Sequence, residues 1–351
     1  MAKANHHSML DNRFIIILLL WSLSACSSAS TTPTPVTVQP TAATSASVAQ
    51  ASLPQPPTNL TPVPLAVGER LRVVASTTII GDWTAQVGGD LIDLAVLMPV
   101  GADPHTYKPT PQDLTTVAQA HLLLINGLEL EATLEESLAN AGGSAPMVPI
   151  AFGIPLRQLD PALAAEENAA GDHHHGTEDP HVWTSPYLAI TLVQNIATLL
   201  SELDPPHAAA YQANAQQYTQ QLTELDQWVQ QQIDTIPVGR RQLVTDHAVF
   251  GYYADRYGLT QVGAVIPGFS TGAEPSAQEL AALEDTIRNL QVPALFVGAT
   301  VNPKLSEQIA QDTGIKVLQV YTGSLGPPGS GAASYLDYIR YNTNAFVTGL
   351  K

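Results

Sequence analysis

The sequence predicts an α/β protein with two parallel-sheet lobes joined by a long rigid helix. Three observations lead to this fold class. The chain has 351 residues, which is more than one hydrophobic core usually organises. Short β-rich runs alternate with helical patterns, as in parallel α/β lobes. One long polar helical pattern separates the runs into two groups. Ligands of such sheets bind beyond the carboxyl ends of the strands, so we expect a site in the cleft between the lobes.

Residues 1–25 are expected to be a signal peptide. Lys3 and Arg13 precede the apolar run FIIILLL at 14–20, which is too short to span a bilayer comfortably. The run ends in Leu23-Ser24-Ala25-Cys26, which resembles the lipobox of bacterial lipoproteins. Cys26 is therefore the expected lipidation site, and an uncleaved anchor with an incidental cysteine is the alternative. A single cysteine also excludes an intramolecular disulfide and a cysteine-based zinc cluster.

Residues 26–67 are expected to be a disordered tether. The segment is rich in Ser, Thr, Pro and Ala and has few large apolar residues. Such a composition cannot bury enough surface to fold, and its prolines favour extended conformations. A lipid followed by a tether predicts a domain that works beside a membrane without entering it.

The first lobe is expected over residues 68–205 and the second over 237–351. Each contains β-rich runs separated by helical patterns. The runs are LRVVAS at 71–76, IDLAVLM at 92–98, HLLLIN at 121–126, MVPIAF at 147–152, QLVTD at 242–246, ALFVG at 294–298 and KVLQVY at 316–321.

Two helices are predicted in the middle of the chain. Ser185-Pro186 is a suitable N-cap and first-turn pair, and an apolar stripe of helical period follows up to Leu203. Asp204-Pro205-Pro206 ends this helix. The second helix, within residues 206–236, would be about 40 Å long and is interpreted as the link between the lobes. An ordinary surface helix of one large domain is the alternative.

The charge of the chain excludes one class of partner. Fourteen Lys and Arg stand against 31 Asp and Glu, a formal net charge of −17. A surface this acidic repels phosphate backbones, so no nucleic-acid partner is expected. The acidic surface is only weak evidence for a cationic ligand, because net charge bears on solubility more than on the chemistry of a binding site.

Three of the ten histidines lie where α/β folds place ligands. His105 follows the run that ends near Met98, His247 follows the first run of the second lobe, and His181 precedes the helix that begins after Ser185. Neutral imidazole nitrogens at converging loop ends suit zinc. Spacing alone does not make these histidines a cluster, since a single histidine is more often a surface or hydrogen-bonding residue.

Over residues 69–351 the chain resembles the zinc/manganese solute-binding proteins of ABC importers, the cluster A-I receptors. The blocks that carry the resemblance include VVASTTIIGDW at 73–83, GADPHTYKPTPQDL at 101–114, DPHVWTSP at 179–186, TDHAVFGYYADRYGL at 245–259 and SLGPPGSGAASYLDYIRYN at 324–342. The resemblance implies an extracytoplasmic, lipid-anchored, monomeric receptor and no enzyme. It implies metal ligands at His105, His181 and His247, and delivery to a membrane permease driven by an ATPase.

The chain departs from the family pattern at two carboxylates. The family usually has a fourth ligand, an aspartate, just before the SLG block, where this chain has Gly323. Gly298 stands where members commonly carry glutamate. Three protein ligands are therefore expected, with water or a residue of a neighbouring histidine-rich loop as the fourth.

That loop contains His173, His174 and His175, which resemble the histidine-rich loops of zinc-type receptors. It is expected to gather metal as an auxiliary site, or else to be a solvated loop without a role. Asp103, Asp179 and Asp246 each lie one or two residues before a predicted ligand. They are candidates to orient the ligands through hydrogen bonds without contacting the metal. Alternatively, they are turn or cap residues.

The donor set favours Zn²⁺ over Mn²⁺, because imidazole suits zinc and manganese prefers oxygen ligands. Two other interpretations remain open. Three histidines with an open position also describe a catalytic zinc site, but the sequence has no HExxH motif. The lost carboxylates also fit a manganese or iron receptor, a weak metal buffer, or a receptor for another ligand.

Overall fold

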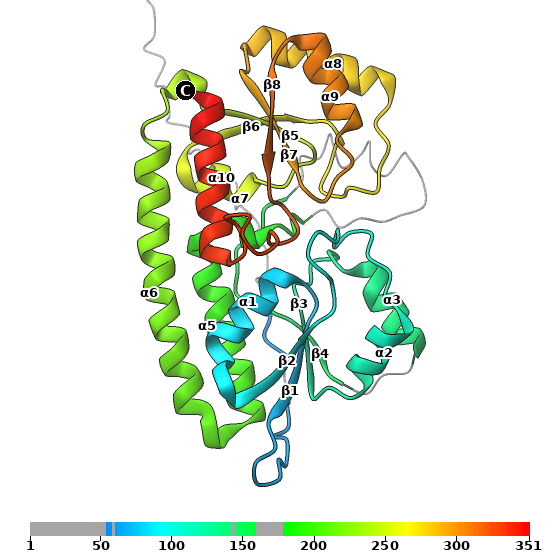
Figure 1. The fold of residues 1–351 in the computed structure, drawn as a ribbon, viewed down its shortest axis with the longest axis vertical. Coiled ribbons are helices and arrows are strands. Elements are labelled where there is room, and N and C mark those ends of the chain that lie inside the picture. Colours follow the sequence, from blue (N-terminus) through cyan, green and yellow to red (C-terminus); the bar gives the residue numbers. More distant parts are fainter. Residues whose placement is uncertain (1–53, 58–59, 142–144, 159–177) are drawn as a thin grey trace, which may run out of the picture. The chain divides into compact units, whose positions relative to one another are not determined.

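The computed structural model describes residues 54–57, 60–141, 145–158 and 178–351. The described residues belong to one compact unit, residues 51–351. They contain two four-stranded sheets whose strands are all parallel. The two sheets point the carboxyl ends of their strands toward each other (Figure 1). The predicted fold class of two parallel-sheet α/β lobes is confirmed.

The sheet of the first lobe has the strand order β2-β1-β3-β4. Its strands are β1 (Leu71–Ala75), β2 (Ile92–Val96), β3 (Leu122–Ile125) and β4 (Met147–Pro149). Helices α1 (Thr78–Gly88), α2 (Pro111–Ala118) and α3 (Ala132–Ala141) alternate with them. The four strands lie within the four runs predicted from the sequence. β3 is buried along its whole length, as expected for a strand covered on both faces.

The sheet of the second lobe has the order β6-β5-β7-β8, which repeats the arrangement of the first. Its strands are β5 (Gln242–Thr245), β6 (Thr260–Ala264), β7 (Ala294–Gly298) and β8 (Lys316–Val320). Its helices are α7 (Gly251–Tyr257), α8 (Ala277–Leu290), α9 (Lys304–Thr313) and α10 (Tyr335–Leu350). β6 was not predicted, because TQVGA is a half-exposed edge strand with little apolar signal.

Helices α5 (Pro186–Leu203) and α6 (Ala208–Ile233) lie between the lobes in sequence and pack against each other. Ser185 is the N-cap residue of α5, and a short turn at Pro205–His207 separates the two helices. α6 also packs on α1 of the first lobe and α10 of the second (Figure 1). α6 lies within residues 206–236, where the linking helix was predicted. Among the helices described, none combines the length and apolarity needed to cross a membrane.

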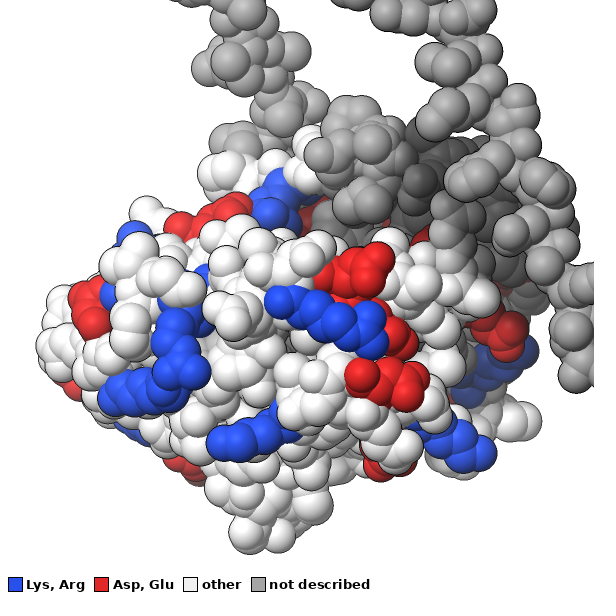
Figure 2. All heavy atoms as spheres, turned by 90° about the horizontal axis from the view of Figure 1, so that it is seen from above, with Lys and Arg blue, Asp and Glu red and all other residues white. Residues whose placement is uncertain are grey.

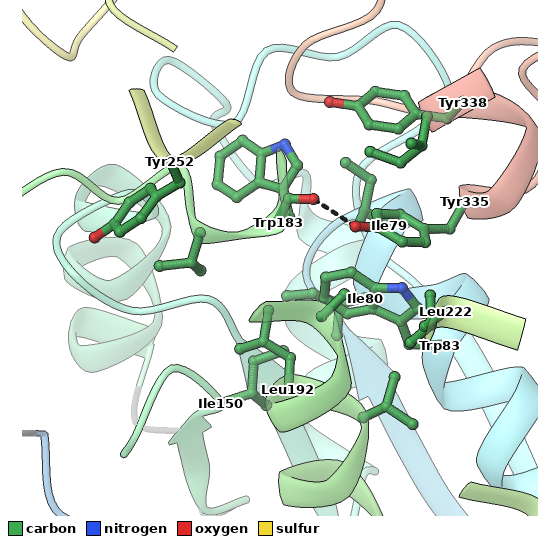
Figure 3. Packing of buried hydrophobic residues seen from close by; sticks show 14 of the residues in the cluster. Ile79, Ile80, Trp83, Ile150, Trp183, Leu192, Leu222, Tyr252, Tyr335 and Tyr338 are labelled. Atoms are coloured by element: carbon green, nitrogen blue, oxygen red, sulfur yellow. Dashed lines mark hydrogen bonds between the residues drawn. The ribbon is translucent and has the colours of Figure 1, made fainter. Parts of the chain in front are cut away.

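One hydrophobic cluster continues from the first lobe into the second. It contains residues of β1, α1, α5, α6, α7 and α10. Figure 3 shows how Trp183, which follows His181, lies between side chains of both lobes. Tyr335 donates a hydrogen bond to the carbonyl of Trp183 at 2.8 Å, and the Trp183 indole donates one to the carbonyl of Thr322 at 3.0 Å. The lobes are therefore joined by packing as well as by the chain.

The folded body begins earlier than the predicted boundary at residue 67. Leu60, Val63 and Leu65 pack against the core cluster, and the Val63 amide donates to the carbonyl of Leu203 at 2.8 Å. Residues 60–66, here called the strap, were expected to belong to the disordered tether. Cys26 and the rest of the expected signal and tether up to residue 53 lie outside the described residues.

A buried carboxylate joins the ends of two strands of the first lobe. Glu131 is 1% exposed and accepts hydrogen bonds from the Ser76 hydroxyl (2.7 Å) and from the amides of Asn126 (2.8 Å) and Gly127 (3.1 Å). Burial raises the pKa of Glu131 to about 7, although these three donors oppose the shift. Glu131 thus fixes the loop after β3, which borders the cleft.

The strap contributes to stability through its apolar contacts. Replacing both Val63 and Leu65 with alanine should lower the free energy of unfolding by about 2 kcal/mol, since both side chains are only partly buried. Replacing the fully exposed Val67 with alanine is the matched control and should change it by less than about 0.5 kcal/mol. Urea unfolding measures the free energy of unfolding of both variants. Equal stability of the double variant and the wild type would contradict the packing of the strap.

Glu131 makes stability depend on pH. Because its folded pKa of about 7 lies above the unfolded value near 4.5, its contribution is fully present below pH 4.5 and is lost as the pH rises through 7. Glu131→Gln removes this titration. The stability of the variant relative to the wild type should therefore improve by about 3 kcal/mol between pH 4.5 and pH 8. Urea unfolding of both proteins across this range tests the expectation, and a constant difference would contradict it.

Candidate metal centre

The three predicted histidines converge in the cleft. His105 lies in the loop between β2 and α2, His181 lies directly before the short turn Val182–Thr184, and His247 follows β5. One nitrogen of each ring lies within 4.8 Å of those of the other two, and this is the only such cluster of His, Cys, Asp and Glu among the residues described. His181 and His247 are buried, at 0% and 2% exposure, and His105 is half-buried.

The ring geometry fits a tetrahedral metal ion. The Nε2 atoms of His105 and His181 are 3.2 Å apart. Two nitrogens bound at 2.0–2.1 Å to a tetrahedral zinc ion lie about 3.3 Å apart. The centroids of the three rings are 5.2 to 5.6 Å from one another. The rings therefore form a nearly equilateral group, with one nitrogen of each within 4.8 Å of those of the other two.

Asp179 orients the ring of His181. Its Oδ1 lies 2.8 Å from His181 Nδ1 and accepts from the His181 amide at 3.0 Å. Its Oδ2 pairs with the Arg157 guanidinium at 2.9 Å. A carboxylate that accepts the proton of Nδ1 fixes the tautomer and turns Nε2 toward the metal position. Asp179 thus orients the ring of His181, and its second partner, Arg157, could not be predicted from the sequence.

Asp246 orients His247 in the same way but has a different second partner. Its Oδ1 lies 2.9 Å from His247 Nδ1, and its Oδ2 accepts the Gly298 amide at 2.7 Å. A Cβ atom at Gly298 would lie 2.8 Å from Asp246 Oδ2 and 2.5 Å from Thr322 Oγ1. The space that a family glutamate would need is therefore filled by the Asp246 carboxylate and Thr322.

Asp103 lies at the site but uses its oxygens differently. Oδ1 accepts the His105 amide at 3.1 Å. Oδ2 accepts the hydroxyls of Thr106 at 3.3 Å and of Thr271 at 2.5 Å. Asp103 thus holds the backbone of its histidine and contacts the second lobe, whereas the other two aspartates hold imidazole rings.

Burial shifts the pKa values of His181 and of its partner Asp179. It lowers the pKa of His181 well below its ordinary value, and the nearby His247 lowers it further while Asp246 opposes the shift. Burial also raises the pKa of Asp179 to about 6, although the His181 amide and Arg157 stabilise its charged form. A neutral His181 presents a free nitrogen lone pair, which is the form that binds metal.

Gly323 faces the loop of His105. A Cβ atom at this position would lie 2.5 Å from Cδ of Pro104, the buried residue before His105. The proline ring occupies the start of the path that an aspartate side chain would take. The absence of the usual family aspartate is therefore matched by local packing.

A small cavity of about 20 Å³ opens beside His105. It is lined by His105, Leu128, Glu129, Glu178, Pro180, Phe269 and Ser270. Leu128 and Glu129 both have positive φ, at 58° and 61°, a strained backbone for residues other than glycine. Glu129, Phe269 and Ser270 could not be predicted as site residues, because no spacing or composition signal marks them.

The negative charge is concentrated in the first lobe. Residues 68–205 carry 18 Asp and Glu against four Lys and Arg, whereas residues 237–351 carry nine against eight. Figure 2 looks down on the second lobe and shows both signs there. Residues 68–205 therefore carry a formal net charge of −14 and residues 237–351 one of −1. The predicted auxiliary residues His173, His174 and His175 lie outside the described residues.

Comparisons with known proteins agree on one family. The chain matches the family described as "Zinc-uptake complex component A periplasmic" (ZnuA) over residues 73–349. The manganese-binding lipoprotein MntA of Halalkalibacterium halodurans is 32% identical over 286 residues, covering 81% of this chain and 89% of the relative. The manganese ABC transporter substrate-binding lipoprotein PsaA of Streptococcus pneumoniae is 31% identical over 289 residues, covering 81% and 90%.

Solved structures show the same fold. The periplasmic zinc binding protein TroA from Treponema pallidum superposes with a TM-score of 0.71 at 27% identity, covering 80% of this chain and 99% of that one. A manganese-bound periplasmic metal binding protein from Candidatus Liberibacter asiaticus gives 0.70 at 24% identity, covering 80% and 100%. Both are named as metal-binding proteins. The chain therefore belongs to the ZnuA family, the cluster A-I substrate-binding proteins of ABC transporters.

Proposed function

We propose that this protein is an extracytoplasmic receptor of an ABC importer that captures a divalent metal ion with His105, His181 and His247. The observation that carries the proposal is the 3.2 Å separation of two imidazole nitrogens in a group of three. The metal would be cargo that passes to a membrane permease driven by an ATPase. Cys26 would hold the receptor at the membrane through a lipid, and we expect it to act as a monomer.

Zinc is the proposed cargo. The relatives are named for different metals, manganese for MntA and PsaA and zinc for TroA, so the donor atoms must decide. Three imidazoles suit zinc, whereas manganese favours carboxylate and water oxygens. In this chain the carboxylates of Asp179 and Asp246 are turned to Nδ1 atoms and away from the metal position.

Water is the proposed fourth ligand. The cavity beside His105 measures about 20 Å³, and about 10–15 Å³ is enough for one water molecule. Glu129, Glu178 and Ser270 offer it oxygen partners in the lining. His173, His174 and His175 are proposed as an auxiliary site that gathers metal ahead of the cleft.

The central test is the metal content of residues 27–351 after metal stripping and exposure to equal zinc and manganese. We expect about one zinc per chain, which His247→Ala should abolish. Because protons compete with metal for imidazole nitrogens, zinc affinity should fall as the pH decreases from 7.5 to 5.5, and His181, whose pKa is lowered by burial, should contribute least to this fall. Metal analysis and zinc titration measure both effects. A preference for manganese, or affinity that is independent of pH, would contradict the three-histidine zinc site.

Restoring the family aspartate should not improve the site. In Gly323→Asp the new side chain begins 2.5 Å from Pro104, so the loop that carries His105 must shift to accept it. We expect zinc affinity to fall about ten-fold or more, because a displaced ligand weakens the whole site. Ala333→Asp, at an exposed alanine of the same loop, controls for the added charge. Tighter manganese or zinc binding by Gly323→Asp would mean that the fourth position accepts a carboxylate.

A further inference from the structure

A hydrogen bond across the cleft ties the loop of His105 to the second lobe. Each proposed ligand is preceded by an aspartate, and two of these aspartates hold the ring of their own histidine. Asp103 instead accepts the hydroxyl of Thr271 at 2.5 Å. Thr271 lies in the loop between β6 and α8, far from Asp103 in the sequence. The third aspartate thus joins the two sides of the proposed metal site.

The loop that carries Thr271 lies against the site. The Ile266 amide donates to the carbonyl of Asp246 at 2.7 Å, and the Ala248 amide donates to the carbonyl of Gly268 at 3.0 Å. Phe269 then packs edge-on against His181, with ring centroids 6.2 Å apart. Phe269 and Ser270 are both buried. The loop is therefore held beside His247 at its start and covers His181 before it reaches Thr271.

The His105 loop has a second bond to the same lobe at its other end. The Gly101 amide donates to the Ser324 hydroxyl at 2.9 Å. Between Gly101 and Asp103 the chain has few ways to move without breaking one of the two bonds. Thr271 holds the end that is nearer to His105 and to the cavity lined by Phe269 and Ser270.

We propose that Thr271 is a positioning residue of the metal site, which acts through Asp103 to keep His105 in place against the second lobe. This inference rests on the proposed metal-capture function. His105 is the most exposed of the three ligands, so it is the one most readily displaced. Breaking the bond between Asp103 and Thr271 frees its loop to swing away and lets the metal leave. The bond therefore slows metal release.

The test compares two substitutions of one side chain in the full chain, solubilised in detergent and loaded with zinc. Thr271→Val keeps the shape and removes the hydroxyl, whereas Thr271→Ser keeps the hydroxyl. Release of zinc to an excess of chelator is followed by stopped flow, with Trp183, 5.1 Å from His181, as the fluorescent reporter. We expect roughly ten-fold faster release from Thr271→Val, the scale of one hydrogen bond to a charged group, and near-wild-type release from Thr271→Ser.

Two further variants separate positioning from general loosening. Thr286→Val makes the same substitution on α8, where the hydroxyl donates to Ala282 of its own helix, and should release zinc at the wild-type rate. Asp103→Asn keeps an acceptor for the His105 amide and loses the charged partner of Thr271, so it should also speed release. If the bond is responsible, adding Thr271→Val to Asp103→Asn should change the rate little.

The outcomes distinguish this inference from the function on which it rests. Wild-type release from Thr271→Val, or equally fast release from both Thr271 variants, would overturn the positioning role while leaving metal capture intact. A wild-type protein that retains no zinc would instead overturn the proposed function, and this inference with it. Thermal unfolding of the metal-free variants should stay close to that of the wild type. A large loss of stability in Thr271→Val, without one in Thr271→Ser, would assign the bond to folding and not to the site.

Discussion

The continuous core between the lobes is the constraint on which the metal centre depends. His105 and His181 belong to the first lobe and His247 to the second, so their nitrogens meet only if the lobes keep a fixed spacing. Trp183 contributes both to the spacing of the lobes and to the position of His181. Its ring packs near His181, and its indole N–H donates a hydrogen bond to the carbonyl of Thr322. The carbonyl of Trp183 accepts a hydrogen bond from the Tyr335 hydroxyl. The packing that holds the lobes together therefore also places a ligand, and wide opening of the cleft would disrupt the core.

The two buried imidazoles also need hydrogen-bond partners, and the carboxylates that supply them are stabilised in different ways. A buried ring needs a partner for Nδ1, and a buried carboxylate in turn needs donors of its own. Asp179 is stabilised by the charge of Arg157. Asp246 is stabilised by the amide of Gly298, which can approach because glycine has no side chain there. The glycine that looks like a lost carboxylate in the sequence is thus a donor to the carboxylate that remains.

Strong local signals in the sequence predicted the lobes and the linking helix, whereas the convergence of the histidines was expected from the blocks that resemble a known family. Buried parallel strands such as β3 are apolar throughout, and His105 and His181 lie in recognisable blocks. The half-exposed edge strand β6 lacks such a signal, and the strap has the composition of a tether although Val63 and Leu65 pack. Arg157, Phe269 and Thr271 could not be predicted, because their roles arise from contacts between segments that are distant in sequence.

The composition of the donor set explains why positioning matters in this chain. Where the family has an aspartate ligand, a metal ion gains a direct attraction to a negative charge; at Gly323 that attraction is missing. Retention then depends on three neutral nitrogens and on how firmly each is held. The rings of His181 and His247 are buried and held by carboxylates, and His105 is the most exposed of the three. A receptor must also release its ion. In this chain the contact that can be adjusted for release lies beside His105, where the Thr271 side chain of the opposite lobe donates a hydrogen bond to Asp103.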